Sequence, residues 1–251
     1  MFESTLNDGV LQLYRPETRW LSTGWNGGTS HSAAAYNITV PTGWEETDID
    51  DYVSDRLQTA GFAEPGPALL TGVEMGDVRG ARLGPAVAYA TAGVSNPAAL
   101  PVSNESENCQ QTVPNEHTGD ETDISEQENS VHYGQGQGTV NLIVGVDRQL
   151  SAAGRANMLT VVAEAKAATL LSLVGVPGTT TDAVIVGDNP DGEAVQFTGS
   201  ATPVGDSVRA CVREAVSASL ASRYEDDPMP QSVDEATYGV TTSRQAEVFD
   251  P

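Results

Sequence analysis

The chain has 251 residues and a mass of 26.2 kDa, and its 35 acidic against 12 basic residues give a formal net charge of −23. A field of this sign repels nucleic-acid phosphates and anionic lipid headgroups, so we expect neither nucleic acid nor a membrane as a partner. A chain of this length can bury about 70% of its unfolded surface, which favours one domain with a substantial core.

The first hundred residues alternate short β-type runs with glycine-containing turns. Between these runs, Asp48 to Ala60 places apolar side chains at helical spacing, carries acids in its first turn and is followed by Gly61, which predicts a helix. We predict strands at residues 11–14, 33–40, 69–73 and 86–92.

The composition changes abruptly over residues 101–137. This stretch holds eight acids, no lysine or arginine and few large apolar side chains. Such a segment cannot bury enough apolar surface to offset the entropy lost on ordering. We therefore predict an acidic, disordered insertion here.

Ordered structure is predicted to resume at Gly138. Residues 139–146 form an apolar run typical of a buried strand. Ser151 is a good N-cap for a helix over residues 152–173, and Gly175 stands where such a helix would end.

A second short buried strand is predicted at residues 183–186, and a last amphipathic helix at 205–222. Beyond Tyr224 the chain is acidic, polar and interrupted by prolines, so we predict a flexible tail over residues 225–251. Residues 1–224 are expected to form a single domain of the α+β class. We expect a layered sandwich with a mixed or mostly antiparallel sheet and at least two helices packed on one face.

Lys166 is the one lysine of the chain, since the other eleven basic residues are arginine. In one interpretation its stem covers the core and its ammonium reaches a carboxylate or water. In the other it is a positioned cation or a base in a catalytic site. Both stay open, because a projection at about 100° per residue places Lys166 in the middle of an apolar side made by Met158, Leu159, Val162, Ala165, Leu170 and Leu173.

A turn rich in hydroxyl groups precedes the strand predicted at 183–186. Its sequence is Pro-Gly-Thr-Thr-Thr-Asp over residues 177–182, beside the end of a helix. Backbone N–H groups and side-chain donors can converge there on an oxyanion, and Thr180 or Thr181 can act as a nucleophile with Asp182 as polariser or base. The alternative is an ordinary turn whose side chains bond their own backbone.

Two further turns are candidate contacts for a ligand. Asn26, Gly27 and Gly28 form a turn that allows close approach to the backbone. Ser95 and Asn96 follow a predicted strand and can donate to a substrate carbonyl, although a plain turn explains them as well.

The sequence holds no Walker loop, GxGxxG, HExxH or CxxC motif, which argues against nucleotide hydrolysis, nicotinamide chemistry and zinc. Cys109 and Cys211 give neither a disulfide framework nor a metal-ligand spacing.

Acid excess with a single lysine is typical of a protein that works in molar salt, where the Debye length is about 3 Å, so we hypothesise a halophilic host. We expect a cytoplasmic protein, because the start of the chain lacks a basic region followed by an apolar stretch. In addition, no uncharged apolar run approaches the about 18 residues of a membrane helix.

Seven short segments follow one another in a distinctive order: Leu21-Ser22-Thr23, Asn26-Gly27-Gly28, Asn37 with Val40-Pro41, residues 92–96 (AGVSN), 138–141 (GTVN), 164–166 (EAK) and 178–183 (GTTTDA). Each is short, but their joint order and spacing resemble the adenosylcobinamide amidohydrolase family of archaeal corrinoid salvage. The resemblance spans nearly the whole chain except residues 101–137 and the tail after about Tyr224.

The resemblance implies hydrolysis of the amide that joins the aminopropanol arm to the corrin ring of adenosylcobinamide. The product would be adenosylcobyric acid for coenzyme B12 synthesis, the partner a small-molecule corrinoid, and neither cofactor nor metal is implied. The candidate catalytic residues are Lys166, Thr180, Thr181 and Asp182. The candidate substrate-binding residues are Asn26, Gly27, Gly28, Asn37, Ser95, Asn96 and Asn141.

In this scheme the two threonines with Asp182 supply the nucleophile or a water and its base, and Lys166 supplies a proton or the charge that faces the oxyanion. The asparagines would contact the amide groups of the corrin.

Two other functions fit the same residues. A corrinoid-binding module would use polar turns of this kind without cutting the ligand. An acyl-transfer enzyme of the N-terminal-nucleophile type is a further alternative, because the order strand, helix, Gly-Thr-Thr-Thr-Asp, strand also resembles the layered fold of ornithine acetyltransferases and aminopeptidases. That enzyme would cleave itself ahead of a threonine or serine, so an intact chain of 26.2 kDa would argue against it.

Overall fold

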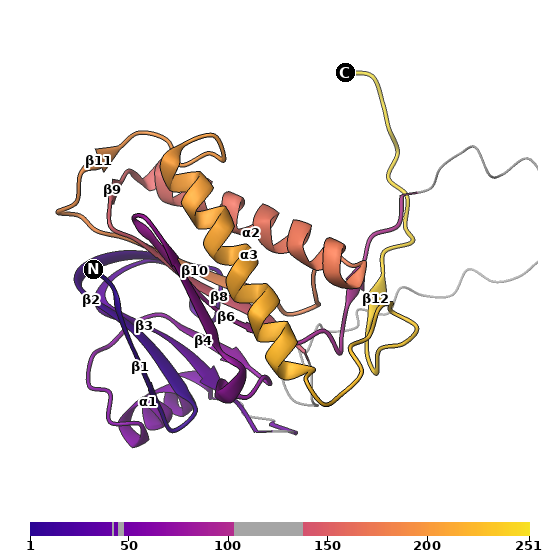
Figure 1. Ribbon diagram of the computed structural model, residues 1–251, viewed down its shortest axis with the longest axis horizontal. Helices are drawn as coiled ribbons and strands as arrows, with labels where there is room; N and C mark the ends of the chain where they lie inside the picture. The colour runs from indigo at the N-terminus through magenta and orange to yellow at the C-terminus, as the bar shows by residue number, and fades with distance from the viewer. Residues whose placement is uncertain (42, 45–47, 103–137) are drawn as a thin grey trace, which may run out of the picture.

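The computed structural model describes residues 1–41, 43–44, 48–102 and 138–251 (Figure 1). Its three helices within these ranges lie where the sequence predicts them. The elements are β1 (Glu3–Asn7), β2 (Val10–Ser22), β3 (Gly28–Thr39), α1 (Ile49–Thr59), β4 (Ala68–Thr71), the 3-10 turn η1 (Met75–Asp77), β5 (Arg79–Leu83), β6 (Ala86–Ala92), β7 (Ala98–Ala99), β8 (Val140–Val146), β9 (Gln149–Leu150), α2 (Ala152–Val174), β10 (Ala183–Asp188), β11 (Ala194–Val195), α3 (Pro203–Arg223) and β12 (Val240–Thr241).

Eight strands form one mixed sheet in the order β4-β3-β2-β10-β8-β6-β5, with β1 pairing with the first half of β2. The pairs β3–β4 and β8–β10 are parallel, and the other pairs are antiparallel. Helices α2 and α3 lie side by side across one face of this sheet (Figure 1). The predicted α+β class, with a mixed sheet and two helices on one face, is confirmed.

The main core lies between this face and the two helices. Because side chains alternate along a strand, every second residue of β6, β8 and β10 faces α2 and α3. The fully buried contributors include Ala88, Leu142, Val144, Val186, Met158, Val162, Val212 and Leu220. Each large one adds about 1.5–3 kcal/mol of hydrophobic stabilisation. Leu173, which we placed on the apolar side of its helix, is instead 39% exposed.

The ends of the two long helices follow from local capping. The Ser151 hydroxyl accepts a hydrogen bond from the Gly154 N–H at 3.0 Å, and Gly175 ends α2 in the left-handed conformation with φ 73°. The Thr202 hydroxyl accepts from the Gly205 N–H at 3.0 Å. Helix α3 therefore begins two residues earlier than the apolar pattern predicts, with Pro203 in its first turn.

The opposite face of the sheet has its own core, built on Phe2, Leu13, Trp20 and Ile185. A glycine at position 187 makes room for it, since a Cβ there would lie 2.3 Å from Cζ3 of Trp20. Helix α1 packs against strands β3 and β4.

Among the described residues one helix, α2, is long and apolar enough to cross a membrane by length and composition alone. Its buried residues pack against the sheet and α3. Core helices of layered domains have the same character.

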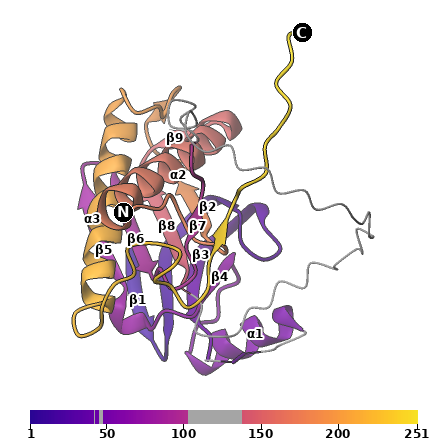
Figure 2. The same ribbon diagram turned by 90° about the vertical axis from the view of Figure 1, so that its right-hand side faces the viewer.

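The tail after Tyr224 was predicted to be flexible, and the structure pairs residues 238–242 of it with the segment that contains β7. Strand β12 pairs in parallel with β7, and the N–H groups of Tyr238, Val240 and Thr242 donate to carbonyls of residues 95–99 (Figure 2). The pattern was missed because these bonds use backbone groups and need no apolar side chain. The predicted insertion lies outside the described residues from position 103 to 137.

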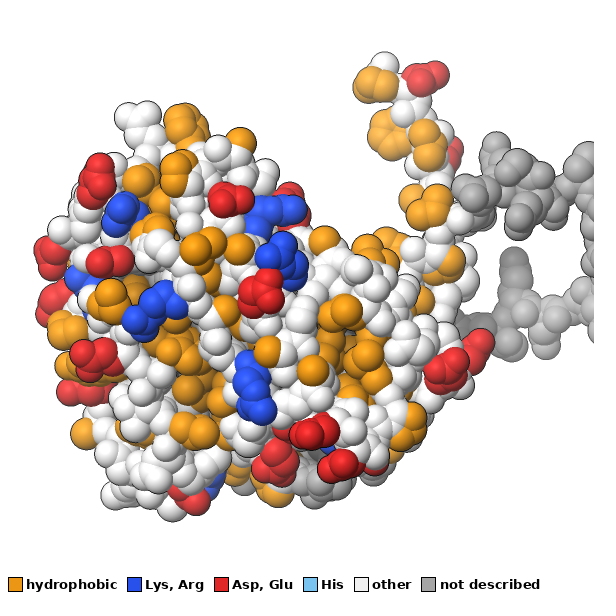
Figure 3. Space-filling model, viewed as in Figure 1, with side chains coloured by type: hydrophobic (Ala, Val, Ile, Leu, Met, Phe, Trp, Pro, Cys, Tyr) orange, Lys and Arg blue, Asp and Glu red, His pale blue; other side chains and the backbone are white. Residues whose placement is uncertain are grey.

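The charge is unevenly distributed along the chain. Ten of the 35 acids fall outside the described residues, whereas all twelve basic residues fall within them. On the face in Figure 3, acidic and basic side chains are interspersed. The described part therefore carries a milder negative charge than the whole chain.

Cys211 lies on the buried side of α3, is 1% exposed and donates its Sγ–H to the Ala86 carbonyl at 3.7 Å. Burial raises the pKa of the Cys211 thiol above its ordinary value. Because the thiolate is the reactive form, we expect iodoacetamide to leave Cys211 unmodified in the native protein at pH 7.5 and to modify it in guanidinium chloride. Peptide mass spectrometry measures this residue separately, and rapid native labelling would contradict its burial.

Candidate active site

Several segments meet at one edge of the sheet. Strand β6 runs antiparallel to β8, and β8 runs parallel to β10, so the end of β6 lies beside the starts of β8 and β10. Residues 93–99, 138–139 and 177–182 therefore converge, and we call residues 177–182 the threonine turn. The turn after β2 joins them, because Ser22 pairs with Ile185 near the start of β10.

Lys166 reaches this edge from α2 and pairs with Asp182 of the threonine turn. The two side chains are 12% and 8% exposed. A side chain at residue 178 would crowd this pair, since a Cβ would lie 2.8 Å from Oδ2 of Asp182 and 3.3 Å from Nζ of Lys166. Lys166 therefore points inward, as the helical projection predicts. The ammonium group of Lys166 is also part of the candidate site.

Four donors fix the carboxylate of Asp182. Oδ2 accepts from Lys166 and from the Thr179 N–H at 3.0 Å, and Oδ1 accepts from the Thr179 hydroxyl and from the Val140 N–H at 2.9 Å. An ionised carboxylate has about four acceptor positions, so all of them are occupied. Asp182 thus holds Lys166 in place.

The two candidate nucleophiles differ in their surroundings. Thr180 is exposed, and its Oγ1 accepts from Nδ2 of Asn96 at 2.6 Å, while its N–H donates to the Asn96 carbonyl at 3.2 Å. The hydroxyl of Thr181 is half-buried and shares a hydrogen bond of 2.8 Å with the hydroxyl of Thr139. Thr180 therefore presents the more accessible hydroxyl.

Asn96 is 2% exposed, and its Oδ1 has no hydrogen-bond partner among the described residues. A buried amide oxygen gains from a donor, so it suits an N–H or O–H of a bound molecule. The neighbouring Ser95 hydroxyl accepts from the Gly138 N–H at 2.5 Å and so ties two of the converging segments together.

Asn37 and Asn141 meet inside the molecule, on the sheet face away from α2 and α3. Nδ2 of Asn141 donates to Oδ1 of Asn37 at 3.1 Å and to the Leu70 carbonyl at 2.8 Å, and Nδ2 of Asn37 donates to the Thr91 hydroxyl at 2.9 Å. The two asparagines are 2% and 0% exposed. The network links β3, β4, β6 and β8 next to the site, and substrate contact by either residue stays a prediction.

The turn at residues 26–28 lies against α1. Asn26 has φ 48°, and its side-chain amide donates to Oδ1 of Asp50 at 2.8 Å. Gly28 has φ 105°, which favours glycine, and Gly27 donates its N–H to the Gly24 carbonyl at 3.0 Å. The structure brings the turn to the same edge as the threonine turn, with the Asn26 amide engaged by Asp50.

Thr139 and Thr179 are not among the site residues predicted from the sequence. Thr179 holds Asp182 through its N–H and hydroxyl, and Thr139 holds Thr181. Both stand inside segments that carry the family resemblance, so that signal was available. The hydrogen bond from the Val140 N–H to Asp182 could not be predicted from side-chain types, because it depends on how β8 and β10 pair.

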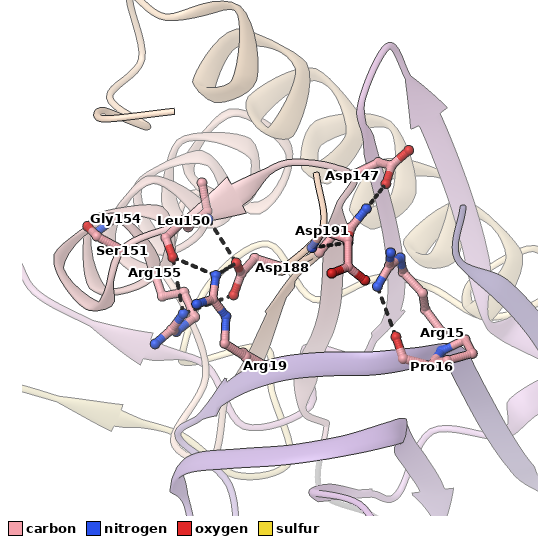
Figure 4. Close-up of polar contacts among 11 residues, drawn as sticks. Arg15, Pro16, Arg19, Asp147, Leu150, Ser151, Gly154, Arg155, Asp188 and Asp191 are labelled. Carbon is pink, nitrogen blue, oxygen red and sulfur yellow. Dashed lines mark hydrogen bonds and ion pairs between the residues drawn. The ribbon is translucent and has the colours of Figure 1, made fainter. Parts of the chain in front are cut away.

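A second polar cluster lies at the opposite end of α2 (Figure 4). Asp188, which is 0% exposed, accepts from Arg19, from Nη1 of Arg155 at 3.0 Å and from the Leu150 N–H at 2.8 Å. Both arginines also donate to the Leu150 carbonyl. The cluster anchors the first turn of α2 to β2 and β10.

The family model described as adenosylcobinamide amidohydrolase matches residues 2–228. A protein of Halobacterium salinarum named adenosylcobinamide amidohydrolase is 49% identical over 253 residues, which cover 100% of both chains. Its source fits the acid-rich, lysine-poor composition that suggests a halophilic host. The chain belongs to the adenosylcobinamide amidohydrolase family.

Proposed function

We propose that the protein hydrolyses the amide between the aminopropanol arm and the corrin ring of adenosylcobinamide, which releases adenosylcobyric acid for cobamide salvage. The observation that carries this proposal is the family match over residues 2–228, together with 49% identity to the named Halobacterium salinarum protein along its full length. The candidate site supports it, since the amine of Lys166, the carboxylate of Asp182 and the exposed hydroxyl of Thr180 lie at one edge of the sheet.

Amide hydrolysis needs a nucleophile, charge or donors for the tetrahedral oxyanion, and a proton for the leaving amine. The Lys166 ammonium suits the last two tasks, because Asp182 holds it in one orientation. A cation that is only 12% exposed interacts more strongly with a developing oxyanion than one in bulk water. In this scheme Asp182 is a positioning residue and Lys166 is the catalytic cation.

We assign the attack to the Thr180 hydroxyl or to a water that it holds. The proton that the nucleophile loses passes to the nitrogen of the leaving aminopropanol as the C–N bond breaks, and where Thr180 itself attacks, water then hydrolyses the resulting ester. Asn96 donates to Oγ1 of Thr180, so the hydroxyl proton of Thr180 points away from Asn96. Thr181 is engaged with Thr139 and supports the turn.

Substitution of the two threonines separates these roles. We expect Thr180→Ala to lower kcat by at least about 100-fold, within the range for general acid–base and nucleophile support. We expect Thr181→Ala to lower it by less than about tenfold, the effect of losing one neutral hydrogen bond. Steady-state assays in molar KCl give both values, and a larger loss in Thr181→Ala would reverse the assignment.

The reaction itself is tested by incubating the purified protein with adenosylcobinamide in molar KCl. Mass spectrometry should show free aminopropanol and adenosylcobyric acid. Ligand that stays bound and intact would instead favour the corrinoid-binding module. Intact-mass analysis of the protein tests the N-terminal-nucleophile alternative, which needs a cleaved chain.

We also propose that hydrolysis needs no metal and no cofactor, since the groups assigned above supply the charge and the protons. Among the described residues, no group of three or more His, Cys, Asp or Glu side chains is placed to hold a metal ion. We expect extensive dialysis against EDTA to leave kcat unchanged, and recovery of a lost activity by added metal would contradict this. A cytoplasmic location is part of the same proposal, and cell fractionation tests it.

A further inference from the structure

The segment that carries Ser95 and Asn96 is bonded along both of its edges. On one edge it meets the threonine turn, where the Ala98 N–H donates to the Gly178 carbonyl at 2.9 Å and the Thr180 N–H donates to the Asn96 carbonyl at 3.2 Å. On the other edge it meets the C-terminal tail. We call residues 95–99 the bridging segment.

The contacts of the tail are regular. The N–H groups of residues 238, 240 and 242 donate to the carbonyls of residues 95, 97 and 99 at 3.0, 2.9 and 3.0 Å. The alternation matches the two-residue period of an extended strand, so odd-numbered carbonyls of the bridging segment face the tail and even-numbered groups face the threonine turn. The bridging segment is thus the middle one of three adjacent extended segments.

The tail adds little to the core. Val240 is 50% exposed and Tyr238 is 40% exposed, so hydrophobic burial is a small part of what this strand contributes. Its approach is close, however, because a Cβ at Gly239 would lie 2.9 Å from Cγ1 of Val233 and 3.1 Å from the Pro97 carbonyl oxygen. The tail therefore contributes backbone hydrogen bonds that hold the bridging segment in position, and it contributes little buried apolar surface.

We propose that the backbone N–H groups of Tyr238, Val240 and Thr242 are a positioning element of the active site, which holds the bridging segment so that Asn96 aligns the Thr180 hydroxyl. The inference rests on the proposed function. The Asn96 side chain and backbone both bond Thr180, so a shift of the bridging segment moves the hydroxyl directly. A misplacement of about 1 Å at a reacting group can lower a rate by about 100-fold.

Two proline variants test the proposal with matched chemistry. Val240→Pro removes the N–H that donates to the Pro97 carbonyl. Thr241→Pro alters the next residue, whose N–H points to the other edge of the strand, where proline is tolerated. We expect Val240→Pro to lower kcat by about 10- to 100-fold with KM within about threefold of wild type, and Thr241→Pro to stay within about threefold.

Truncation gives a second pair of variants. A chain that ends at residue 237 lacks the whole paired stretch, whereas one that ends at residue 242 retains its three donors. We expect only the shorter chain to lose kcat, with thermal unfolding midpoints of both close to wild type. Equal kcat in the two chains would overturn the proposal, as would an equal loss in both proline variants.

Hydrogen exchange supplies a readout that does not need turnover. In Val240→Pro the amides of Ala98 and Thr180, which bond across the bridging segment and the threonine turn, should exchange at least about tenfold faster than in Thr241→Pro. Unchanged exchange at both amides would overturn the positioning role. If the wild-type protein did not hydrolyse adenosylcobinamide, the proposed function would fail, while the exchange data would still decide whether the tail holds the turn.

Discussion

Replacing Lys166 by methionine is expected to lower the turnover of adenosylcobinamide by about 10²- to 10⁴-fold, the range for loss of a positioned proton donor or oxyanion partner. Methionine keeps the length and the apolar stem but removes the charge. The fold should persist, because Asp182 retains the Thr179 N–H, the Thr179 hydroxyl and the Val140 N–H as donors. The loss should appear in kcat, with KM changed little.

Arg209→Met is the matched control, since it exchanges another helix cation for methionine. Arg209 is 40% exposed and lies 3.6 Å from the exposed carboxylate of Glu164, and surface pairs of this kind contribute little. We expect its turnover to match wild type. Steady-state assays in molar KCl, with circular dichroism to confirm folding, measure both variants. A Lys166→Met protein that is folded and keeps near wild-type turnover would remove Lys166 from the mechanism.

Asp188→Asn is expected to lower the free energy of unfolding by about 3–5 kcal/mol, the cost of breaking a buried ion cluster by removing one partner. Asp188 is fully buried and balances Arg19 and Arg155. An amide offers one oxygen and no charge, so it leaves two partly buried guanidinium groups without their counter-ion. Urea unfolding followed by circular dichroism, in molar KCl, measures the difference.

Glu193→Gln serves as the comparison for Asp188→Asn. Glu193 pairs with Arg148 at 3.6 Å on the surface, and its side chain is 79% exposed. We expect a change within about 1 kcal/mol. Similar losses in the two variants would contradict the structural role of the cluster. Because Lys166 lies about 16 Å along the helix axis from Arg155, turnover per folded molecule should stay near wild type in Asp188→Asn.

Local signals in the sequence account for much of the fold. Ser151 and Gly175 mark the ends of α2 because capping depends on residues within one turn of the helix end. Strand β6 runs over residues 86–92, as its apolar run predicts. The inward direction of Lys166 follows from helical periodicity alone.

Long-range pairing is what the sequence did not show. The neighbourhood of β2 and β10 joins residues more than 160 positions apart, and no local pattern specifies it. The Arg19–Asp188 contact depends on that pairing, and so does the meeting of the Val140 N–H with Asp182. The hydrogen bonds of β12 are made by backbone N–H groups, which every residue except proline possesses. The composition of the tail therefore predicts flexible chain at a place where the structure has a strand.

The single lysine, held against Asp182, also gives the protein an unusual spectroscopic property. Isotopic labelling of lysine Nζ with ¹⁵N introduces one side-chain ammonium signal for the entire molecule, and that signal comes from the candidate site. Burial slows the exchange of its protons with water, which makes such a signal observable. A titration with a corrinoid could therefore be followed at one assigned nucleus, without mutagenesis and without waiting for turnover.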